Sequence, residues 1–199
     1  MIHHDDPLDD GELLYLPAFL PSSDASQLLQ QLSNEVSWRQ EQITLYGKTH
    51  NIPRLQAFQG EPGLHYRYSR LNLTSTTWHP AITSLLPRLE QQCASQFNCA
   101  LLNLYRDGND AMGWHSDDEP ELGQNPVIAS LSLGQSRRFL LRHKQHPQQK
   151  KIELTLHHGD LLVMSGNTQH NWQHSCPRTR KALNPRINLT FRQILNPGA

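Results

Sequence analysis

The spacing of hydrophobic residues changes near residue 100, and the change divides the chain into two parts. Before it, apolar residues recur every three or four positions, as on one face of a helix. The first such face is formed by Ala25, Leu28, Leu29 and Leu32. Ser22, Ser23 or Asp24 is the expected N-cap of this helix, because each can accept a hydrogen bond from a free backbone N–H group.

A second helix is predicted after Trp78 and His79. Pro80 suits a first helical turn, where its missing N–H group costs nothing. The apolar face would hold Ala81, Leu85, Leu89 and Cys93. Pro87 falls inside this segment and predicts a kink or a break.

After residue 100 the chain consists of short β-type runs separated by turn residues. The runs cover residues 101–105, 127–133, 139–142, 152–156, 161–164 and 187–194. The connectors at 107–110 and 157–160 are typical of hairpins, whereas the stretch 167–185 is too long to be one. Many short strands behind two helices predict an α+β, mainly β fold, with a double-stranded β-helix (jelly roll) as its core.

We expect one catalytic domain over residues 1–199. Within it, residues 1–38 form an N-terminal extension and a helix, and residues 100–195 form the β-helix core. Residues 39–75 combine scattered glycines and prolines with aromatic side chains. Long irregular segments of this kind are often functional, so we interpret residues 39–75 as a lid over the core.

Composition narrows the functional classes. No apolar run approaches the roughly 20 residues that span a bilayer, and no secretory signal is visible, so we expect a cytoplasmic protein. The three cysteines are expected to be free thiols. The net charge is zero, but basic residues gather at 137–151 and 178–186. A polyanion could bind there, and an ordinary solvated surface explains these segments equally well.

Candidate metal ligands occur two residues apart at His115 and Asp117. On an extended strand end both side chains point to the same side. A second histidine from elsewhere, His170 or His174, would complete two imidazoles and one carboxylate. This ligand set, with its open positions, is that of Fe(II) oxygenases.

A second pattern lies near the C-terminus. Alternation along residues 186–192 puts Arg186, Asn188, Thr190 and Arg192 on one face of a strand and the apolar residues on the other. A half-exposed basic strand would look the same. The functional alternative is a pocket for a dicarboxylate, because guanidinium groups bind carboxylates through paired hydrogen bonds.

Together these motifs resemble the AlkB family of 2-oxoglutarate-dependent nucleic-acid dealkylases, especially the branch of the animal DNA-repair members. The matching segments are Asn-Leu-Tyr-Arg-Asp-Gly at 103–108, Trp-His-Ser-Asp-Asp-Glu at 114–119, Ile-Ala-Ser-Leu-Ser-Leu-Gly at 128–134, His-Gly-Asp-Leu-Leu-Val-Met at 158–164, Trp-Gln-His-Ser at 172–175 and Arg-Ile-Asn-Leu-Thr-Phe-Arg at 186–192. A weaker likeness covers residues 53–69. The resemblance favours His174 over His170 as the second histidine ligand.

The resemblance implies that His115, Asp117 and His174 bind Fe(II), with O₂ and 2-oxoglutarate as cosubstrates. It implies that the residues around 2-oxoglutarate are Asn103, Tyr105, Arg186, Asn188, Thr190 and Arg192. Residues 39–75 would be a nucleotide-recognition lid. The implied reaction is oxidative demethylation of DNA bases such as 1-methyladenine and 3-methylcytosine, releasing formaldehyde, succinate and CO₂.

Substrate recognition is expected from four residues. Tyr66 and Tyr68 match positions that enclose a flipped base, although alternating aromatics are also common in simple packing. Tyr46 matches an apolar finger that fills the gap left by such a base, and an exposed hairpin tip is an equal alternative. Asp118 could accept a hydrogen bond from an exocyclic amine.

The expected partner is alkylated DNA, with RNA as an alternative. We expect a monomer with no obligate protein partner and no membrane contact. Two rivals remain at this level: an RNA or protein hydroxylase on the same iron site, and a nucleic-acid-binding module without catalysis.

Overall fold

Two sheets face each other in the computed structural model, which describes residues 8, 10–45, 47–68, 71–146, 148–181 and 183–195. The larger sheet has the order β1 (Glu12–Leu16), β13 (Leu161–Ser165), β10 (Ile128–Gly134), β15 (Arg186–Arg192), β8 (Cys99–Tyr105), β4 (Leu55–Gly60) and β7 (Thr76–Thr77). The smaller sheet has the order β12 (Ile152–Leu156), β11 (Arg137–His143), β14 (Trp172–Cys176) and β9 (Met112–His115). This is the predicted jelly-roll architecture, mainly β.

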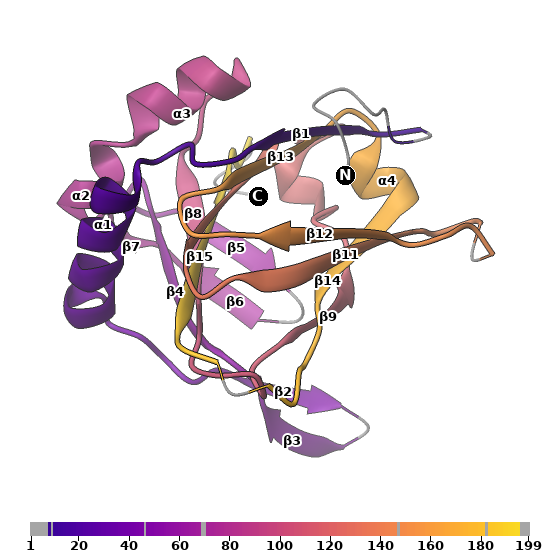
Figure 1. The fold of residues 1–199 in the computed structure, drawn as a ribbon, viewed down its shortest axis with the longest axis horizontal. Coiled ribbons are helices and arrows are strands. Elements are labelled where there is room, and N and C mark those ends of the chain that lie inside the picture. The colour runs from indigo at the N-terminus through magenta and orange to yellow at the C-terminus, as the bar shows by residue number, and fades with distance from the viewer. Residues whose placement is uncertain are drawn as a thin grey trace.

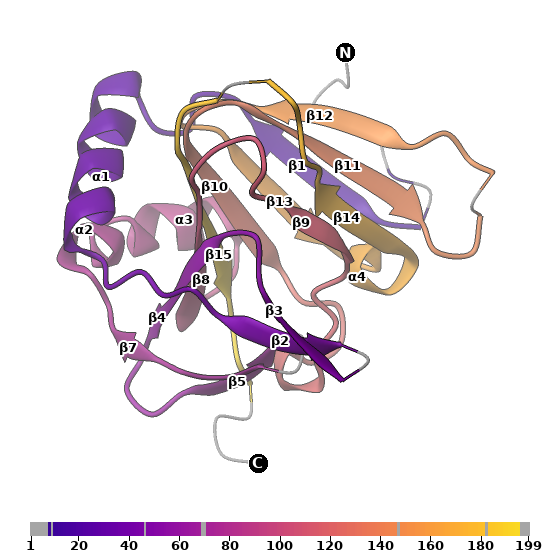
Figure 2. The same ribbon diagram turned by 90° about the horizontal axis from the view of Figure 1, so that it is seen from below.

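Three helices lie on the outer face of the larger sheet, on the side away from the smaller one (Figures 1 and 2). They are α1 (Ser22–Glu35), α2 (Pro80–Thr83) and α3 (Leu86–Cys93). Their buried side chains, such as Leu28, Ile82 and Leu89, pack with the outward residues of the larger sheet. A second hydrophobic cluster fills the space between the sheets around Leu101, Phe139 and Trp172.

Two hairpins account for most of the segment 39–75. They are β2 (Gln42–Leu45) with β3 (Lys48–Asn51), and β5 (His65–Tyr68) with β6 (Leu71–Thr74). The β2–β3 hairpin projects from one end of the molecule (Figure 1). Between the two hairpins, β4 pairs with β8 inside the larger sheet. The core sheet therefore uses strands from outside the predicted range 100–195, namely β1, β4 and β7.

The helix predictions were right in position and wrong in detail. The N-cap of α1 is Pro21, with no side-chain cap, because the helix begins at Ser22 and the three predicted candidates lie within its first turn. The second helical segment breaks before Pro87 into α2 and α3. Of the predicted apolar face, Leu89 is fully buried, and Ala81, Leu85 and Cys93 are partly buried against the same core, to which Ile82 is added.

The two predicted hairpin connectors are not hairpins. Residues 107–110 join β8 to β9, and residues 157–160 join β12 to β13, and in both cases the two strands belong to different sheets. The stretch 167–185, predicted to be too long for a hairpin connector, contains α4 (Thr168–Asn171) and β14. A short 3₁₀ helix, Pro120–Leu122, follows the His115–Asp117 segment.

Candidate active site

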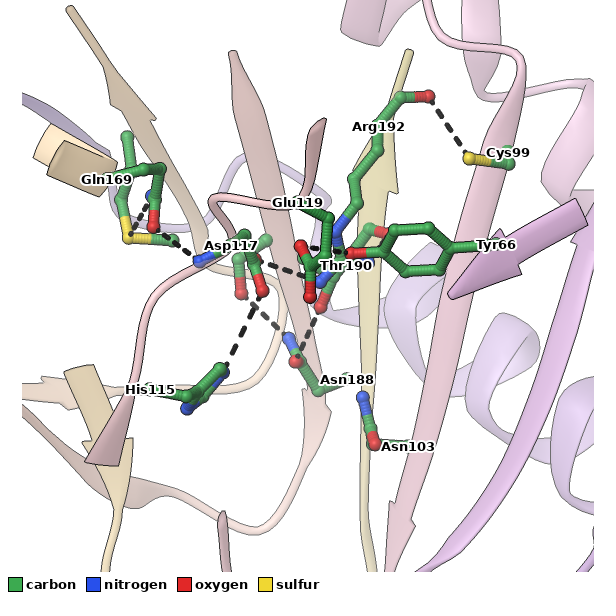
Figure 3. Close-up of polar contacts among 12 residues, drawn as sticks. Tyr66, Cys99, Asn103, His115, Asp117, Glu119, Gln169, Asn188, Thr190 and Arg192 are labelled. Atoms are coloured by element: carbon green, nitrogen blue, oxygen red, sulfur yellow. Dashed lines mark hydrogen bonds and ion pairs between the residues drawn. The ribbon is translucent and has the colours of Figure 1, made fainter. Parts of the chain in front are cut away.

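A small cavity lies between the two sheets. Its polar lining comes from β8, β9, β10, β14 and β15 and from the segment after β9. Its residues are Asn103, Tyr105, Met112, His115, Asp117, Ser130, Phe139, Met164, His174, Cys176, Arg186, Asn188, Thr190 and Arg192. Every predicted metal and 2-oxoglutarate residue is among them, and Figure 3 shows how several converge.

His115 and His174 face each other across the β9–β14 pair, as directly opposed residues of antiparallel strands. Their ring centroids are 4.2 Å apart. Nδ1 of His115 lies 2.9 Å from the carbonyl oxygen of Gly113, which can only accept a hydrogen bond. Nδ1 therefore carries the proton of the neutral ring, and the lone pair for a ligand is on Nε2.

Asp117 brings a buried carboxylate to the same point, with its side chain 1% exposed. Its Oδ2 accepts a 2.8 Å hydrogen bond from Nη2 of Arg192. Its Oδ1 accepts no hydrogen bond among the described residues and lies 3.9 Å from Nε2 of His115. One oxygen is thus held by an arginine while the other is available to a cation.

The electrostatics suit metal binding. Burial and the neighbouring His115 lower the pKa of His174 to about 3, and burial also lowers the pKa of His115, so both rings are neutral near pH 7. Burial acts to raise the pKa of Asp117, but Arg192 and the two imidazoles outweigh it, so the pKa stays below its usual value. The result is one carboxylate and two neutral imidazoles.

Ligand atoms of His115, Asp117 and His174 all lie within 4.8 Å of one another. In the part of the chain that the structure describes, no other cluster of three such residues is as close. His170, the rival to His174, is exposed in α4 and takes no part in this group. The donor set and the uncompensated Oδ1 of Asp117 fit a divalent cation of the Fe(II) type.

An anion site adjoins this group on β15. The apolar residues of β15 pack toward the helices, while Arg186, Asn188 and Thr190 line the cavity. Nη2 of Arg186 donates to Oγ of Ser132 at 2.9 Å, and its buried Nε has no hydrogen-bond partner among the described residues. A buried guanidinium with a free N–H group fits a carboxylate.

The strand register explains why these residues meet. In the β15–β8 pair, Arg186 is opposite Tyr105 and Asn188 is opposite Asn103, so all four side chains fall on the inner face of the sheet. The guanidinium of Arg186 lies 5.2 Å from the centre of the Tyr105 ring. Asn188 donates to Oγ of Ser130 on the other neighbouring strand at 2.8 Å.

Tyr66 lies in the wall of this region rather than on an open surface. It is 1% exposed, stacked on Phe58 on one side with the Arg192 guanidinium 5.5 Å from its ring centre. Its hydroxyl donates to Oε2 of Glu119 at 2.8 Å, as Figure 3 shows. Burial and the nearby Asp117 raise the pKa of Glu119 to about 7. Because both ring faces are covered, Tyr66 offers its hydroxyl and not a stacking surface.

The other predicted substrate residues are only partly described. Asp118 is exposed and forms a 3.0 Å ion pair with Lys144. Tyr68 ends β5, but its side chain lies outside the described part of the structure, and so does the whole of Tyr46. The flanking strands β2 and β3 pair in antiparallel register.

Three site residues were missed from the sequence: Arg54, Glu119 and Gln169. Gln169 is fully buried in α4, and its Oε1 accepts a 2.9 Å hydrogen bond from the backbone N–H of Asp117. Arg54 reaches the cavity wall by hydrogen bonding to Asn103. Glu119 follows Asp117 and Asp118 directly, and that run of acids was the available signal.

The predicted basic patch at 137–151 is not continuous. Arg137 is 4% exposed and donates to the backbone carbonyls of Asp107, Asp110 and Pro177, so it is a structural brace. Arg142 packs over Trp114 and donates to Gln173. Exposed basic residues remain at Arg138, Lys144, Lys150 and Lys151 and, in the second segment, at Arg178, Arg180 and Lys181.

Comparison with known proteins agrees with this geometry. A sequence model of the 2OG-Fe(II) oxygenase superfamily matches residues 12–192. The human protein named alpha-ketoglutarate-dependent dioxygenase alkB homolog 3 is 41% identical over 196 residues, covering 94% of this chain and 68% of its own. The human DNA oxidative demethylase ALKBH2 is 38% identical over 182 residues, covering 87% of this chain and 70% of its own.

A solved structure described as that of OsALKBH1 has the same fold. It superposes with a TM-score of 0.65 at 18% identity, covering 91% of this chain and 97% of the other. No helix within the described residues has the length and apolar character needed to cross a bilayer.

Proposed function

The chain belongs to the 2OG-Fe(II) oxygenase superfamily and, within it, to the AlkB family, and on that premise we propose that this dioxygenase repairs N-alkylated bases in DNA. It uses Fe(II), 2-oxoglutarate and O₂. One observation carries the proposal: a two-histidine, one-carboxylate group shares a single cavity with a buried arginine that has a free donor. The lining of that cavity offers ligands for a divalent cation beside a donor for a dicarboxylate.

In this assignment His115, Asp117 and His174 hold Fe(II). Arg186 pairs with the distal carboxylate of 2-oxoglutarate, and Asn103, Tyr105, Asn188 and Thr190 line its binding site. Arg192 lies at the metal end, where it fixes Oδ2 of Asp117 and leaves Oδ1 for the metal. When bound, Fe(II) with 2-oxoglutarate and O₂ supplies the oxidant that hydroxylates the N-alkyl carbon, while 2-oxoglutarate leaves as succinate and CO₂.

The protein need not cleave the C–N bond itself. A hydroxymethyl group on a base nitrogen collapses to formaldehyde and the unmodified base without a further catalyst. The task of the surrounding residues is therefore to hold the alkyl carbon near the metal and to keep bulk water out. The buried wall formed by Phe139, Met164 and Met112 serves the second purpose.

The proposed substrates are bases with an exocyclic amine, such as 1-methyladenine and 3-methylcytosine. Methylation at these nitrogens makes the base cationic, so carboxyl groups at the cavity favour it. Glu119, oriented by Tyr66, and the exposed Asp118 are the carboxyls nearest in sequence to the metal ligand Asp117. Both can accept a hydrogen bond from an amine, which guanine and thymine do not present at the corresponding position.

Residues 39–75 supply the proposed nucleotide-recognition lid through the β2–β3 and β5–β6 hairpins. We assign base enclosure to Tyr66 and Tyr68, with Tyr66 acting through the Glu119 carboxyl that its hydroxyl holds and not by stacking on the base. We assign a gap-filling role at the hairpin tip to Tyr46. The exposed basic residue Lys48 on β3 is suited to a phosphate contact.

The test is anaerobic addition of Fe(II) and 2-oxoglutarate to the metal-free protein, followed by O₂ and a methylated DNA oligonucleotide. Succinate and repaired base are measured for wild type, His174→Ala and His170→Ala. We expect both products from wild type and from His170→Ala, since His170 is exposed and outside the metal group. We expect neither from His174→Ala.

The other outcomes separate the rivals. Repair of a methylated RNA oligonucleotide in preference to DNA would move the substrate to RNA. Binding of Fe(II) and 2-oxoglutarate with both oligonucleotides unchanged would favour a protein or small-molecule hydroxylase. Absence of metal and 2-oxoglutarate binding would leave only a nucleic-acid-binding module.

A further inference from the structure

The amide of Asn103 is held by two donors from the lid segment. Its Oδ1 accepts a 2.8 Å hydrogen bond from Nε of Arg54 and a 2.9 Å hydrogen bond from Nε2 of Gln56. All three side chains are at least nine-tenths buried. Gln56 pairs with Asn103 across the β4–β8 ladder, so the contact follows from strand register.

These two contacts fix which end of the Asn103 amide faces the cavity. Nε of an arginine can only donate, so the Asn103 atom beside it must be the oxygen. A carbonyl oxygen has two lone pairs, and Arg54 and Gln56 fill both. The amide nitrogen is consequently turned into the cavity that Asn103 lines, and Figure 3 shows it on the side of Asn188.

Arg54 also braces the metal side of the cavity. Its Nη1 donates to the backbone carbonyl of Ala111 at 3.2 Å, and Ala111 directly precedes β9, which carries His115. The backbone N–H of Ala111 in turn donates to the carbonyl of Pro53, next to Arg54. A single guanidinium thus joins the root of the β2–β3 hairpin to a strand that carries a proposed metal ligand and to the proposed cosubstrate wall.

We propose that Arg54 is a positioning residue for 2-oxoglutarate, which acts by holding the Asn103 amide with its N–H donors toward the cosubstrate. The proposal rests on the function above, because it requires 2-oxoglutarate to bind against Asn103. It makes the lid segment part of the cosubstrate site as well as of the nucleotide site. Loss of Arg54 would let the Asn103 amide rotate and present its oxygen to an anionic ligand.

The experiment is an anaerobic titration of the Fe(II)-loaded protein with 2-oxoglutarate, followed by the charge-transfer absorbance of the metal–cosubstrate complex. The variants are Arg54→Met, Asn103→Ala and the two combined. We expect each single variant to weaken 2-oxoglutarate binding about tenfold. We expect the double variant to bind no more weakly than Asn103→Ala, because Arg54 acts through Asn103.

A matched control separates this effect from a loosened hairpin. Arg106 also anchors the hairpin root, by donating to Oε1 of Gln40, but it does not contact Asn103. Arg106→Ala should keep the 2-oxoglutarate affinity of the wild type. Gln56→Leu removes the weaker of the two donors and should weaken binding about threefold.

Several results would overturn the proposal. They are unchanged affinity in Arg54→Met, unchanged affinity in Asn103→Ala, and single effects that add in the double variant. If thermal unfolding shows that Arg54→Met does not fold, Arg54→Lys and Gln56→Leu replace it. Each is then combined with Asn103→Ala, and the 2-oxoglutarate affinities of the single and double variants are compared in the same way. A wild-type protein without a charge-transfer band would instead refute the proposed function.

Discussion

Strand β15 and strand β3 are both rich in polar side chains, yet every residue of β15 is buried and every residue of β3 is exposed. On β15 the polar groups line one side of a cavity, and their hydrogen-bond partners are other residues of the chain, such as Ser130, Ser132 and Asp117. On β3 the side chains of Lys48, Thr49, His50 and Asn51 point mainly into solvent. Burying polar groups is costly unless they are paired, so β15 must be specified in detail by its surroundings, whereas β3 need not be.

The polar groups of β15 and those of β3 therefore serve different kinds of partner. The cavity is built to bind small charged groups in one fixed geometry. The lid hairpin offers exposed groups, such as Lys48 and His50, that a second molecule can contact. On this contrast, single substitutions in the cavity should cause large losses of activity, and single substitutions in the lid should cause small ones.

The largest effect is expected at Asp117, whose carboxylate accepts a hydrogen bond from Arg192 and is the proposed metal ligand. Asp117→Ala should abolish detectable turnover, a loss on the order of a thousandfold or more. It also leaves the Arg192 guanidinium buried with its carboxylate removed, which should destabilise the metal-free protein by about 3–5 kcal/mol. Product formation and urea unfolding measure the two effects. Unfolding at an unchanged urea concentration would contradict the role given to Arg192.

The next effect is expected at Arg186, through the distal carboxylate of 2-oxoglutarate. Arg186→Met should weaken 2-oxoglutarate binding about a hundredfold, because it removes a charge-assisted bidentate contact. Arg138→Met is the control, since Arg138 is exposed and pairs only weakly with Glu153 at 3.5 Å. Titration with 2-oxoglutarate measures both. Equal losses in the two variants would point to overall charge rather than to a specific pocket.

A smaller effect is expected at Gln169, which touches the metal site through the backbone of Asp117. Gln169→Leu should weaken Fe(II) binding about tenfold, as is usual when an outer hydrogen-bond partner of a ligand is lost. Gln173→Leu, which removes a partly exposed amide bonded to Arg142, is the matched control. A metal titration that finds Gln169→Leu equal to the control would show that the cavity is less rigid than its burial suggests.

This contrast also explains what the sequence could and could not predict. Polar and apolar residues alternate along β15, and this alternation separated its two faces. The apolar face packs against the helices, and the polar face lines the cavity with Arg186, Asn188, Thr190 and Arg192. The closeness of His115 and Asp117 is local and visible in the sequence. Their meeting with His174 depends on the β9–β14 register, which only the resemblance could supply.

What the sequence missed depends on contacts at long range. Arg54 lies in a segment of irregular appearance, and its role exists only because β4 pairs with β8. The turns at 107–110 and 157–160 look like hairpins locally, but the closure of two facing sheets sends each chain segment across to the other sheet. Turn residues predict that the chain changes direction, but they do not predict which sheet the next strand joins.

Substitutions of Tyr66 and Glu119, in the proposed substrate region, should have effects between those in the cavity and those on the exposed hairpin. Tyr66→Phe removes only the hydroxyl that donates to Glu119, and it leaves the stacking on Phe58 in place. We expect kcat/KM for a methylated oligonucleotide to fall about tenfold, with the affinity for 2-oxoglutarate unchanged. Glu119→Gln should likewise lower kcat/KM and leave the affinity for 2-oxoglutarate unchanged. A loss of 2-oxoglutarate affinity in either variant would assign this pair to the cosubstrate instead.

The smallest effect is expected on the exposed strand β3. Lys48→Ala should leave the free energy of unfolding within about 0.5 kcal/mol of wild type, because its side chain is exposed. It should weaken binding to a DNA oligonucleotide about twofold to fivefold at low salt and reduce the salt dependence of binding, as the loss of one phosphate contact does. Thr49→Ala, on the opposite face of the same strand, is the control for the hairpin itself. A Lys48→Ala variant with normal DNA affinity would show that Lys48 does not contact the nucleic acid. Strand β15 would then belong to a binding site, and β3 would be an ordinary solvated surface.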